Sequence, residues 1–319
     1  MNHLSRLLAA GALGAALIST PSLAQEAPDP LASAEYVGDA LPGAFLTLPE
    51  GEGPFPVIIV LGGSEGSDSS ARAFTKRFVP QGYAVLGLPY YSPRPEGQDG
   101  HIPGLPAAFQ DIAVDQLATA RDWLRARDDI RGEDIGIYGV SKGAEMGLLA
   151  GAYIDGFAAI AAIATSDVVW EGWGSARKTG SFSWRGEPLP WVPYEGMGAE
   201  FQNPTGPNGR PRLRFPHDKG RNANPGRAVA ARIKVETIDE PVLVAGGDAD
   251  LVWNSGEMAQ NIAERRAEGG LPTVSLVFTD AGHYLSGDGS RETGNRANGE
   301  AQKVIWPATL EFFASHLKD

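Results

Sequence analysis

Short apolar runs alternate along the chain with segments in which apolar residues recur every three or four positions. Residues 57–61 form a continuous apolar run that ends at Gly62, the pattern of a strand buried on both faces. Similar runs predict further strands, and the three- and four-residue spacing predicts amphipathic helices between them. The expected strands span residues 57–61, 83–88, 135–138, 157–163, 241–245 and 273–278, and the expected helices span residues 71–79, 109–124, 144–153, 256–267 and 301–317.

Strands that alternate with helices predict the α/β class, with a mostly parallel sheet covered by helices on both faces. One interruption breaks this order, at about residues 166–235, and it is rich in Gly, Pro, Trp and Arg. Between residues 175 and 234 it carries eleven Lys or Arg against four Asp or Glu. A structureless loop of this length is improbable inside a compact domain, so we expect a lid over the carboxyl edge of the sheet. A disordered basic surface loop is the alternative.

A candidate nucleophile lies between a predicted strand and a predicted helix. Residues 139–143 read Gly-Val-Ser-Lys-Gly, the G-x-S-x-G pattern of a nucleophile elbow, in which a sharp turn raises Ser141 above the sheet. The flanking glycines leave the space that this turn requires, and Gly147 and Gly151 would let the following helix lie close to the sheet. A glycine-rich junction with a spectator serine is the alternative reading.

A serine hydroxyl needs a base, and the chain has five histidines. His283 follows the last predicted strand, where a loop at the carboxyl edge should fall, so it is the candidate base. A surface-loop histidine is the alternative. The remaining four histidines are weaker candidates for the base. They are His3 in the N-terminal leader, His101 in a Gly/Pro loop, His217 in the basic interruption and His316 near the C-terminus.

The base needs an acid that fixes its tautomer, and residues just after the penultimate strand supply two candidates. The Gly-x-x-Asp spacing from Gly247 favours Asp250 over Asp248, which stays open as the alternative acid. The chain order Ser141, Asp250, His283 is the order of α/β-hydrolases. Backbone N–H groups of Lys142 and of either Gly63 or Ser64 are the candidate oxyanion hole.

Composition narrows the classes of partner. A formal charge of −12 argues against nucleic acid as the main partner, and the absence of cysteine excludes disulfides and thiolate metal sites. The sequence does not match the glycine-rich phosphate-binding patterns or the calcium-loop pattern, so no cofactor or metal is expected. Residues 1–24 read as a signal peptide cleaved after Ala24, which predicts an exported, periplasmic or secreted protein without a stable membrane anchor. Residues 25–319 would then form the catalytic domain.

Several stretches together resemble one family. They include "VIIVLGGSEG", "IGIYGVSKGAEMGLLAG", "TSDVVWEG", "SWRGEPLPWVP", "PVLVAGGDADLVWNSGEMA" and "DAGHY", and they spread over most of residues 54–315. The sequence resembles the C-terminal catalytic domain of acyl-CoA thioester hydrolases and bile acid-CoA:amino acid N-acyltransferases, a dienelactone-hydrolase-like branch of the α/β-hydrolases, in a single-domain bacterial exported form. The resemblance implies Ser141 as nucleophile, His283 as base and Asp250 or Asp248 as acid. Cysteine is associated with the transferases at the nucleophile position, so serine favours transfer to water.

The expected activity is hydrolysis of a small carboxylic ester or thioester through an acyl-enzyme. The alternatives are a peptidase-like or dienelactone-hydrolase-like enzyme on the same fold and a non-catalytic periplasmic binding protein. Acyl chain, leaving group and oligomeric state stay open at this point. The candidate substrate residues come from the interruption, whose arginines could bind an anionic leaving group: Trp170, Trp184, Trp191, Arg210, Arg212 and Arg214.

Overall fold

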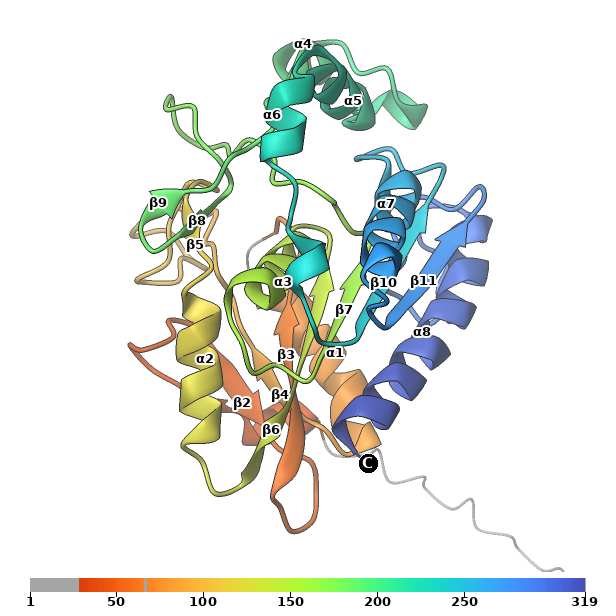
Figure 1. The fold of residues 1–319 in the computed structure, drawn as a ribbon. Coiled ribbons are helices and arrows are strands. Elements are labelled where there is room, and N and C mark those ends of the chain that lie inside the picture. The colour runs from red at the N-terminus through yellow and green to blue at the C-terminus, as the bar shows by residue number, and fades with distance from the viewer. Residues whose placement is uncertain (1–28, 66–67, 319) are drawn as a thin grey trace, which may run out of the picture.

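The computed structural model describes residues 29–65 and 68–318, and the predicted signal peptide lies outside them. A central eight-stranded sheet organises this part of the chain (Figure 1). Its two N-terminal strands are antiparallel, and the other six run parallel. In spatial order the strands are β1 (Glu35–Tyr36), β2 (Phe45–Thr47), β4 (Ala84–Gly87), β3 (Phe55–Leu61), β6 (Ile130–Val140), β7 (Ala159–Ile163), β10 (Val242–Gly247) and β11 (Thr273–Phe278).

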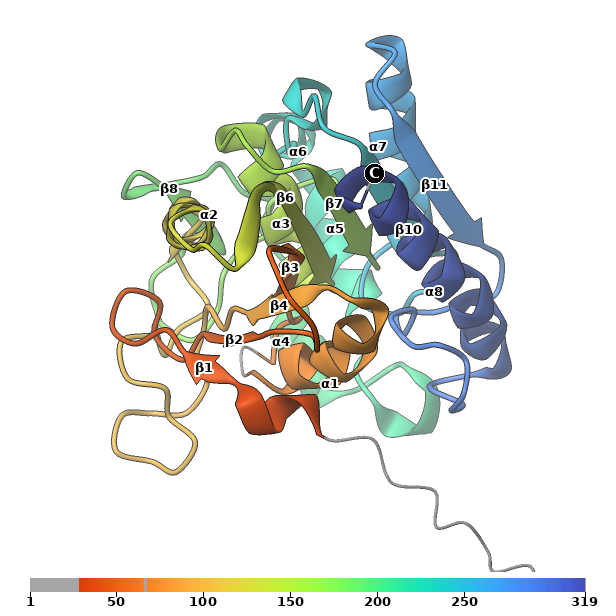
Figure 2. The ribbon, with the colours of Figure 1, turned by 90° about the horizontal axis from the view of Figure 1, so that it is seen from below.

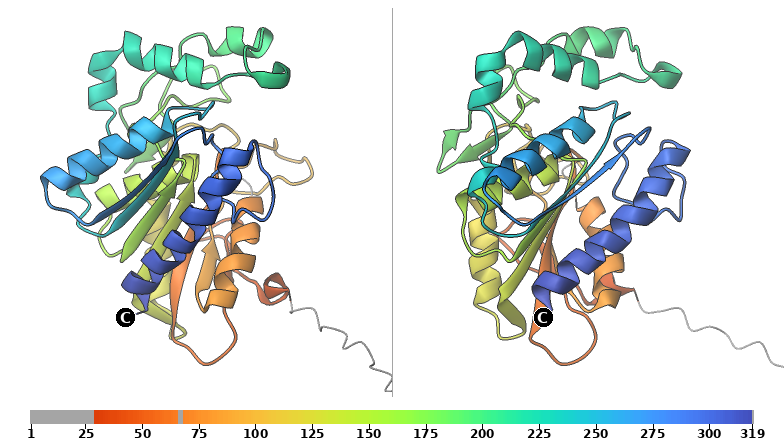
Figure 3. Two further views of the ribbon diagram at one scale, coloured as in Figure 1. Left: turned by 90° about the vertical axis from the view of Figure 1, so that its right-hand side faces the viewer. Right: turned by 45° about the vertical axis from the view of Figure 1, so that its right-hand side comes forward.

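Helices cover both faces of the sheet (Figure 3). One face carries α1 (Ser69–Phe78) and α8 (Arg296–Leu317), and the other carries α2 (Gln116–Arg125), α3 (Lys142–Tyr153) and α7 (Ser255–Glu268). Alternate residues of β3 belong to the two cores, with Ile59 packing in the α2–α3–α7 core and Ile58 in the α1–α8 core. Burial on both sides explains why this strand is a continuous apolar run.

Residues 166–235, called the insertion below, form an ordered layer above the carboxyl edge of the sheet (Figure 1). They contain β8 (Phe182–Trp184), β9 (Glu187–Pro188), α4 (Met197–Gln202), α5 (Arg214–Ala223) and α6 (Pro225–Ala230). Trp170, Val192 and Ala231 of the insertion share a small core with Trp253 and Met258 of the sheet domain. The insertion therefore packs onto the domain through its own apolar residues. Turns of 3-10 helix lie at Pro30–Ser33, Val79–Gln81, Pro207–Gly209 and Val235–Thr237.

The predicted elements recur in the structure with one substantial correction. The helix predicted over residues 109–124 begins only at Gln116. Residues Ile112–Ala113 form instead the short strand β5, which pairs in parallel with β8 of the insertion. Asp111, with a φ of 49°, turns the chain just before β5, so a long-range pairing replaces the local helical pattern. The edge strands β1 and β2 were not predicted, and Figure 2 shows them at the opposite edge of the sheet from β11.

The secondary structure also bears on membrane association. Within residues 29–65 and 68–318, no helix has both the length and the apolar character that a membrane span requires.

Candidate active site

Ser141 occupies the turn between β6 and α3 in a strained backbone conformation. Its φ and ψ are 56° and −118°, a region that costs a non-glycine residue about 1–3 kcal/mol and is typical of functional turns. A Cβ atom at Gly139 would clash with the carbonyl of Gly143, and one at Gly143 would clash with the carbonyls of Leu61 and Gly62. The predicted reason for these two glycines is confirmed, because the backbones on either side of Ser141 touch each other.

The structure brings the three predicted residues together. His283 Nε2 lies 2.9 Å from Ser141 Oγ, and His283 Nδ1 lies 2.7 Å from Asp250 Oδ2. A carboxylate only accepts hydrogen bonds, so Nδ1 of the neutral ring donates to Asp250 and Nε2 accepts from the Ser141 hydroxyl. Ser141 is 8 % exposed and Asp250 is fully buried, so this hydrogen-bonded chain lies just beneath the protein surface.

Asp250 is fully buried and receives several hydrogen bonds besides the one from His283. The Ser255 hydroxyl donates to Oδ2 at 2.6 Å, and the Val252 N–H donates to Oδ1 at 2.7 Å. These donors offset the cost of removing the carboxylate from water. Asp248 is exposed, and among the described residues its carboxylate forms no hydrogen bond or ion pair with His283. The geometry therefore favours Asp250 over Asp248, as the spacing predicted.

Two backbone segments meet beside Ser141 at the predicted oxyanion hole. Lys142 is the first residue of α3, so its N–H has no partner within the helix. A Cβ at Gly63 would lie 3.4 Å from the Ser141 Cβ, which places the Gly63 backbone against Ser141. The Tyr90 hydroxyl lies 2.6 and 2.8 Å from the carbonyls of Gly62 and Gly63. Because a trans peptide directs its N–H away from its C=O, this contact orients the N–H groups of Gly63 and Ser64, and both stay candidates.

The Lys142 side chain is buried, contrary to the usual position of lysine. Its Nζ lies 2.6 Å from Glu145 Oε2 and 2.9 Å from Ser181 Oγ, and both members of the ion pair are at most 2 % exposed. Glu145 Oε1 accepts from the Trp170 N–H at 3.2 Å. Burial lowers the pKa of Lys142 and raises that of Glu145, so each charge depends on its partner. The pair ties the turn that carries Ser141 to the start of the insertion.

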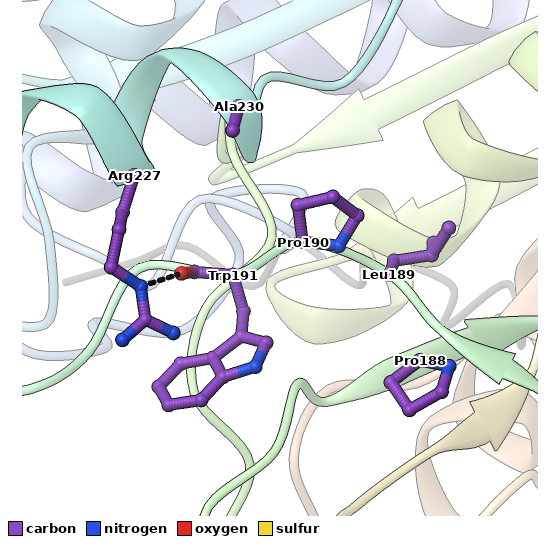
Figure 4. A pocket seen from close by; sticks show the side chains of 6 residues that line it. All are labelled: Pro188, Leu189, Pro190, Trp191, Arg227 and Ala230. Atoms are coloured by element: carbon purple, nitrogen blue, oxygen red, sulfur yellow. Dashed lines mark hydrogen bonds between the residues drawn. The ribbon is translucent and has the colours of Figure 1, made fainter.

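The three tryptophans proposed as substrate residues occupy different environments. Trp170 is fully buried, and its Nε1 donates to Ser166 Oγ at 2.9 Å, so it is a packing residue in this structure. Trp184 stacks on Tyr153 at a ring-centroid distance of 5.3 Å. Trp191 lies under the Arg227 guanidinium, 3.8 Å from the ring centroid, in a surface recess (Figure 4). The recess is lined by Pro188, Leu189, Pro190, Trp191, Arg227 and Ala230, and none of the three hydrogen-bonded residues described above lines it.

The three arginines proposed to bind an anion also differ. Arg210 and Arg212 are exposed on the insertion. Arg214 Nη1 donates to the Asp248 carbonyl at 2.7 Å, and Arg214 Nε lies 3.2 Å from Asp218 Oδ2. Arg214 therefore holds the loop that carries Asp250, and its guanidinium is already occupied by these contacts.

The positive charge of residues 175–234 is partly neutralised. The acids that do so lie in the sheet domain and among the first residues of the insertion. Arg221 forms two hydrogen bonds with Asp167, at 2.6 and 2.8 Å, and Lys178 lies 2.5 Å from Glu171. Arg177 pairs with Asp111. The basic excess counted between residues 175 and 234 is thus partly balanced by acids before residue 175.

Comparison with known proteins assigns the chain to a family. The model described as "BAAT / Acyl-CoA thioester hydrolase C terminal" matches residues 112–287, which include Ser141, Asp250 and His283. The chain belongs to this family. Acyl-coenzyme A thioesterase 1 of Rattus norvegicus is 27 % identical over 249 residues, which cover 76 % of this chain and 51 % of the relative. The chain thus spans about half the length of the curated relatives that it matches.

Solved structures give the fold of this member of the BAAT / acyl-CoA thioester hydrolase C-terminal family. MGS-M1, an α/β-hydrolase enzyme from a Medee basin deep-sea metagenome library, superposes with a TM-score of 0.53 at 12 % identity, covering 89 % of this chain and 95 % of that chain. The acylaminoacyl peptidase of Pyrococcus horikoshii superposes with a TM-score of 0.54 at 16 % identity, covering 86 % and 40 %. The protein has the predicted α/β-hydrolase fold.

Proposed function

We propose that this protein is a serine hydrolase that cleaves carboxylic esters or thioesters through an acyl-enzyme on Ser141. The observation that carries the proposal is the continuous hydrogen-bonded chain from Ser141 through His283 to Asp250, at 2.9 and 2.7 Å. Membership of the BAAT / acyl-CoA thioester hydrolase C-terminal family and the thioesterase name of the matched relatives support thioesters as one substrate class.

The mechanism follows from the hydrogen-bond directions. Ser141 Oγ attacks the substrate carbonyl carbon while His283 Nε2 takes the hydroxyl proton, and Asp250 stabilises the imidazolium. The backbone N–H groups of Lys142 and of Gly63 or Ser64 stabilise the oxyanion. Collapse of this intermediate breaks the bond to the alcohol or thiol, which leaves with the proton from His283. Water, deprotonated by His283, then attacks the acyl-enzyme carbonyl. The bond to Ser141 Oγ breaks, His283 returns the proton to Oγ, and the acid is released.

The environment of Ser141 favours acyl transfer over a passive binding role. A non-catalytic protein would have no need for a serine in a strained turn that also donates to a histidine. Serine in place of cysteine favours water as the acceptor of the acyl group. We therefore place hydrolysis ahead of amino acid transfer for this chain.

A substrate panel with one active-site variant tests the proposal. Purified protein is assayed with nitrophenyl esters, acyl-CoA thioesters and nitroanilide amides, and we expect turnover of esters or thioesters. Ser141→Ala should lower kcat by about a million-fold. Ser315→Ala is the matched control, because Ser315 lies on α8 and its hydroxyl bonds only the Glu311 carbonyl among the described residues. Activity in Ser141→Ala at more than a hundredth of the wild-type rate would reject the mechanism.

Export is proposed on the leader sequence alone. We propose that residues 1–24 direct the chain out of the cytoplasm and are removed after Ala24. N-terminal sequencing of the protein recovered from the periplasmic or culture fraction should begin at Gln25. Recovery of uncleaved chain in the cytoplasmic fraction alone would contradict this.

A further inference from the structure

His217 is a buried histidine, and the mechanism does not use it. It lies on α5 of the insertion, it is 3 % exposed, and its Nδ1 is 2.7 Å from the Leu213 carbonyl oxygen. A carbonyl oxygen only accepts, so Nδ1 carries the ring hydrogen and Nε2 is a bare acceptor. Within residues 29–65 and 68–318, no group donates a hydrogen bond to this buried Nε2.

The surroundings of His217 place it on the same side of the molecule as the hydrogen-bonded chain. Its ring packs edge-on against Trp170 and Tyr194, with centroids at 4.5 and 4.7 Å. It also contacts Trp253 at 5.7 Å, and the same indole contacts the His283 ring at 5.1 Å. The two histidines therefore lie against one tryptophan.

Charged groups of the Ser141 site also act on His217, and burial sets the protonation state of its ring. Lys142, Asp250 and His283 are among the ionisable groups that act on His217, and all three belong to the Ser141 site. Burial lowers the pKa of His217 to about 3, so the ring is neutral at neutral pH and Nε2 keeps its free lone pair. A ring in this state is a poor base but a good hydrogen-bond acceptor.

We propose that His217 is a substrate-binding residue whose Nε2 accepts a hydrogen bond from an O–H or N–H group of the ester or thioester. The donor belongs either to a hydroxylated acyl chain or to an amide in the leaving group. This inference rests on the proposed hydrolase function. It adds a chemical requirement to the substrate, namely a hydrogen-bond donor in its acyl chain or in its leaving group.

The unpaired acceptor explains why such a donor would be selected. A buried polar atom without a partner is unfavourable, and a substrate that supplies the missing hydrogen bond removes that cost. Sites of this kind discriminate against analogues that lack the donor more strongly than apolar pockets discriminate by size. One neutral hydrogen bond should change kcat/KM by about tenfold.

Two matched substrate pairs separate the two possible donors. For the acyl side, the nitrophenyl esters of β-hydroxybutyrate and isovalerate differ only in a hydroxyl replaced by a methyl group. For the leaving group, butanoyl thioesters of N-acetylcysteamine and of mercaptoethyl acetate differ only in an N–H replaced by oxygen. We expect the donor-bearing member of one pair to have a kcat/KM about ten times that of its partner.

Substitutions at His217 then assign the preference to this side chain. His217→Phe keeps a ring of similar size without the acceptor, and it should bring the ratio within that pair close to one. The kcat/KM of the donor-bearing member should fall about ten times further than that of the member without a donor. His217→Gln keeps an acceptor near the position of Nε2 and should retain most of the preference. His316→Phe, which changes a histidine on α8, is the control.

The possible outcomes are distinct. An unchanged ratio in His217→Phe, or an equal loss for both members of each pair in Phe and Gln variants of native thermal stability, would overturn the inference and leave His217 a packing residue. A wild-type ratio of one in both pairs would overturn it as well. If the proposed hydrolase function itself fails, the wild-type protein hydrolyses none of the four substrates, which is a different result from hydrolysis without preference.

Discussion

The buried pair of Lys142 and Glu145 offers a sharp test of what holds the turn that carries Ser141. Each residue is replaced alone, as Lys142→Met and Glu145→Gln, and both are then replaced together. Methionine keeps the length of lysine without the charge. Glutamine keeps an acceptor for the Trp170 N–H, which Glu145 Oε1 now binds at 3.2 Å. The four proteins form a double-mutant cycle.

The structure sets the expected free energies. In Lys142→Met, a carboxylate with no exposed surface loses the ammonium at 2.6 Å. In Glu145→Gln, the ammonium loses its anionic partner and keeps the uncharged Ser181 hydroxyl at 2.9 Å. Leaving one buried charge unpaired costs about 3–5 kcal/mol of unfolding free energy. The double variant buries no charge, and it should lie within about 2 kcal/mol of the wild type. The coupling energy, which is the difference between the summed single losses and the double loss, should therefore exceed about 4 kcal/mol.

Urea unfolding at neutral pH, followed by tryptophan fluorescence and circular dichroism, measures the cycle. The exposed pair Glu300 and Lys303, which has the same three-residue spacing on α8, is the control and should show little change when it is replaced by Gln and Met. Single variants that each lose less than about 1 kcal/mol, with losses that add in the double variant, would refute the reasoning that the buried charges depend on each other.

Three further predictions concern the acid, the glycines and the response to pH. Asp250→Asn should lower kcat by about ten-thousand-fold, whereas Asp248→Asn should leave it within a factor of three or so, as steady-state assays can check. Gly143→Ala should destabilise the fold by about 1–3 kcal/mol through its backbone clash, whereas Gly299→Ala, which meets open space within α8, should stabilise it by about 0.5–1 kcal/mol in thermal unfolding. The pKa of His217 is lower in the folded than in the unfolded chain, so the unfolded chain binds the extra proton, and stability should fall as the pH drops from about 6.5 towards 3. Urea titrations at several pH values should show a weaker fall in His217→Phe, and identical pH profiles for the two proteins would contradict this.

Much of the fold follows from the sequence because the main strands are buried on both faces. The run at residues 57–61 has a single plausible structure, and β3 indeed spans Phe55–Leu61. The same reasoning fails near residue 112, where the spacing of apolar residues fits a helix. Ile112 instead pairs with Phe182, about 70 residues later in the chain, and no local pattern carries information on such a pairing.

The candidate site divides in a similar way. Ser141, Asp250 and His283 could be predicted because each follows a strand of the parallel sheet, and the carboxyl ends of those strands meet at one edge. Lys142 is harder to place, since a lysine beside the nucleophile is expected to reach solvent and only the structure shows its buried partner. His217 carried no signal beyond its residue type, because its position depends on how α5 packs over Trp253.

The positive charge of the insertion illustrates a further limit. A charge count over one segment gives the sign of its surface correctly only if the acids that pair with its basic residues lie inside the counted range. Asp111 and Asp167 lie outside the counted range, and their pairing with Arg177 and Arg221 becomes visible only once the chain is folded. Trp170 is predicted to lie at the substrate but is buried instead. It packs with Trp253 and Met258, which lie far away in the sequence, so only the folded chain shows its burial.

Covalent labelling tests directly whether His283 activates the Ser141 hydroxyl. A fluorophosphonate reacts with a serine only when a base activates the hydroxyl, and peptide mass spectrometry locates the adduct. We expect a single adduct on Ser141 in the wild-type protein and a labelling rate reduced at least about a hundredfold in His283→Ala. An unlabelled Ser141, or labelling at the same rate without His283, would contradict it.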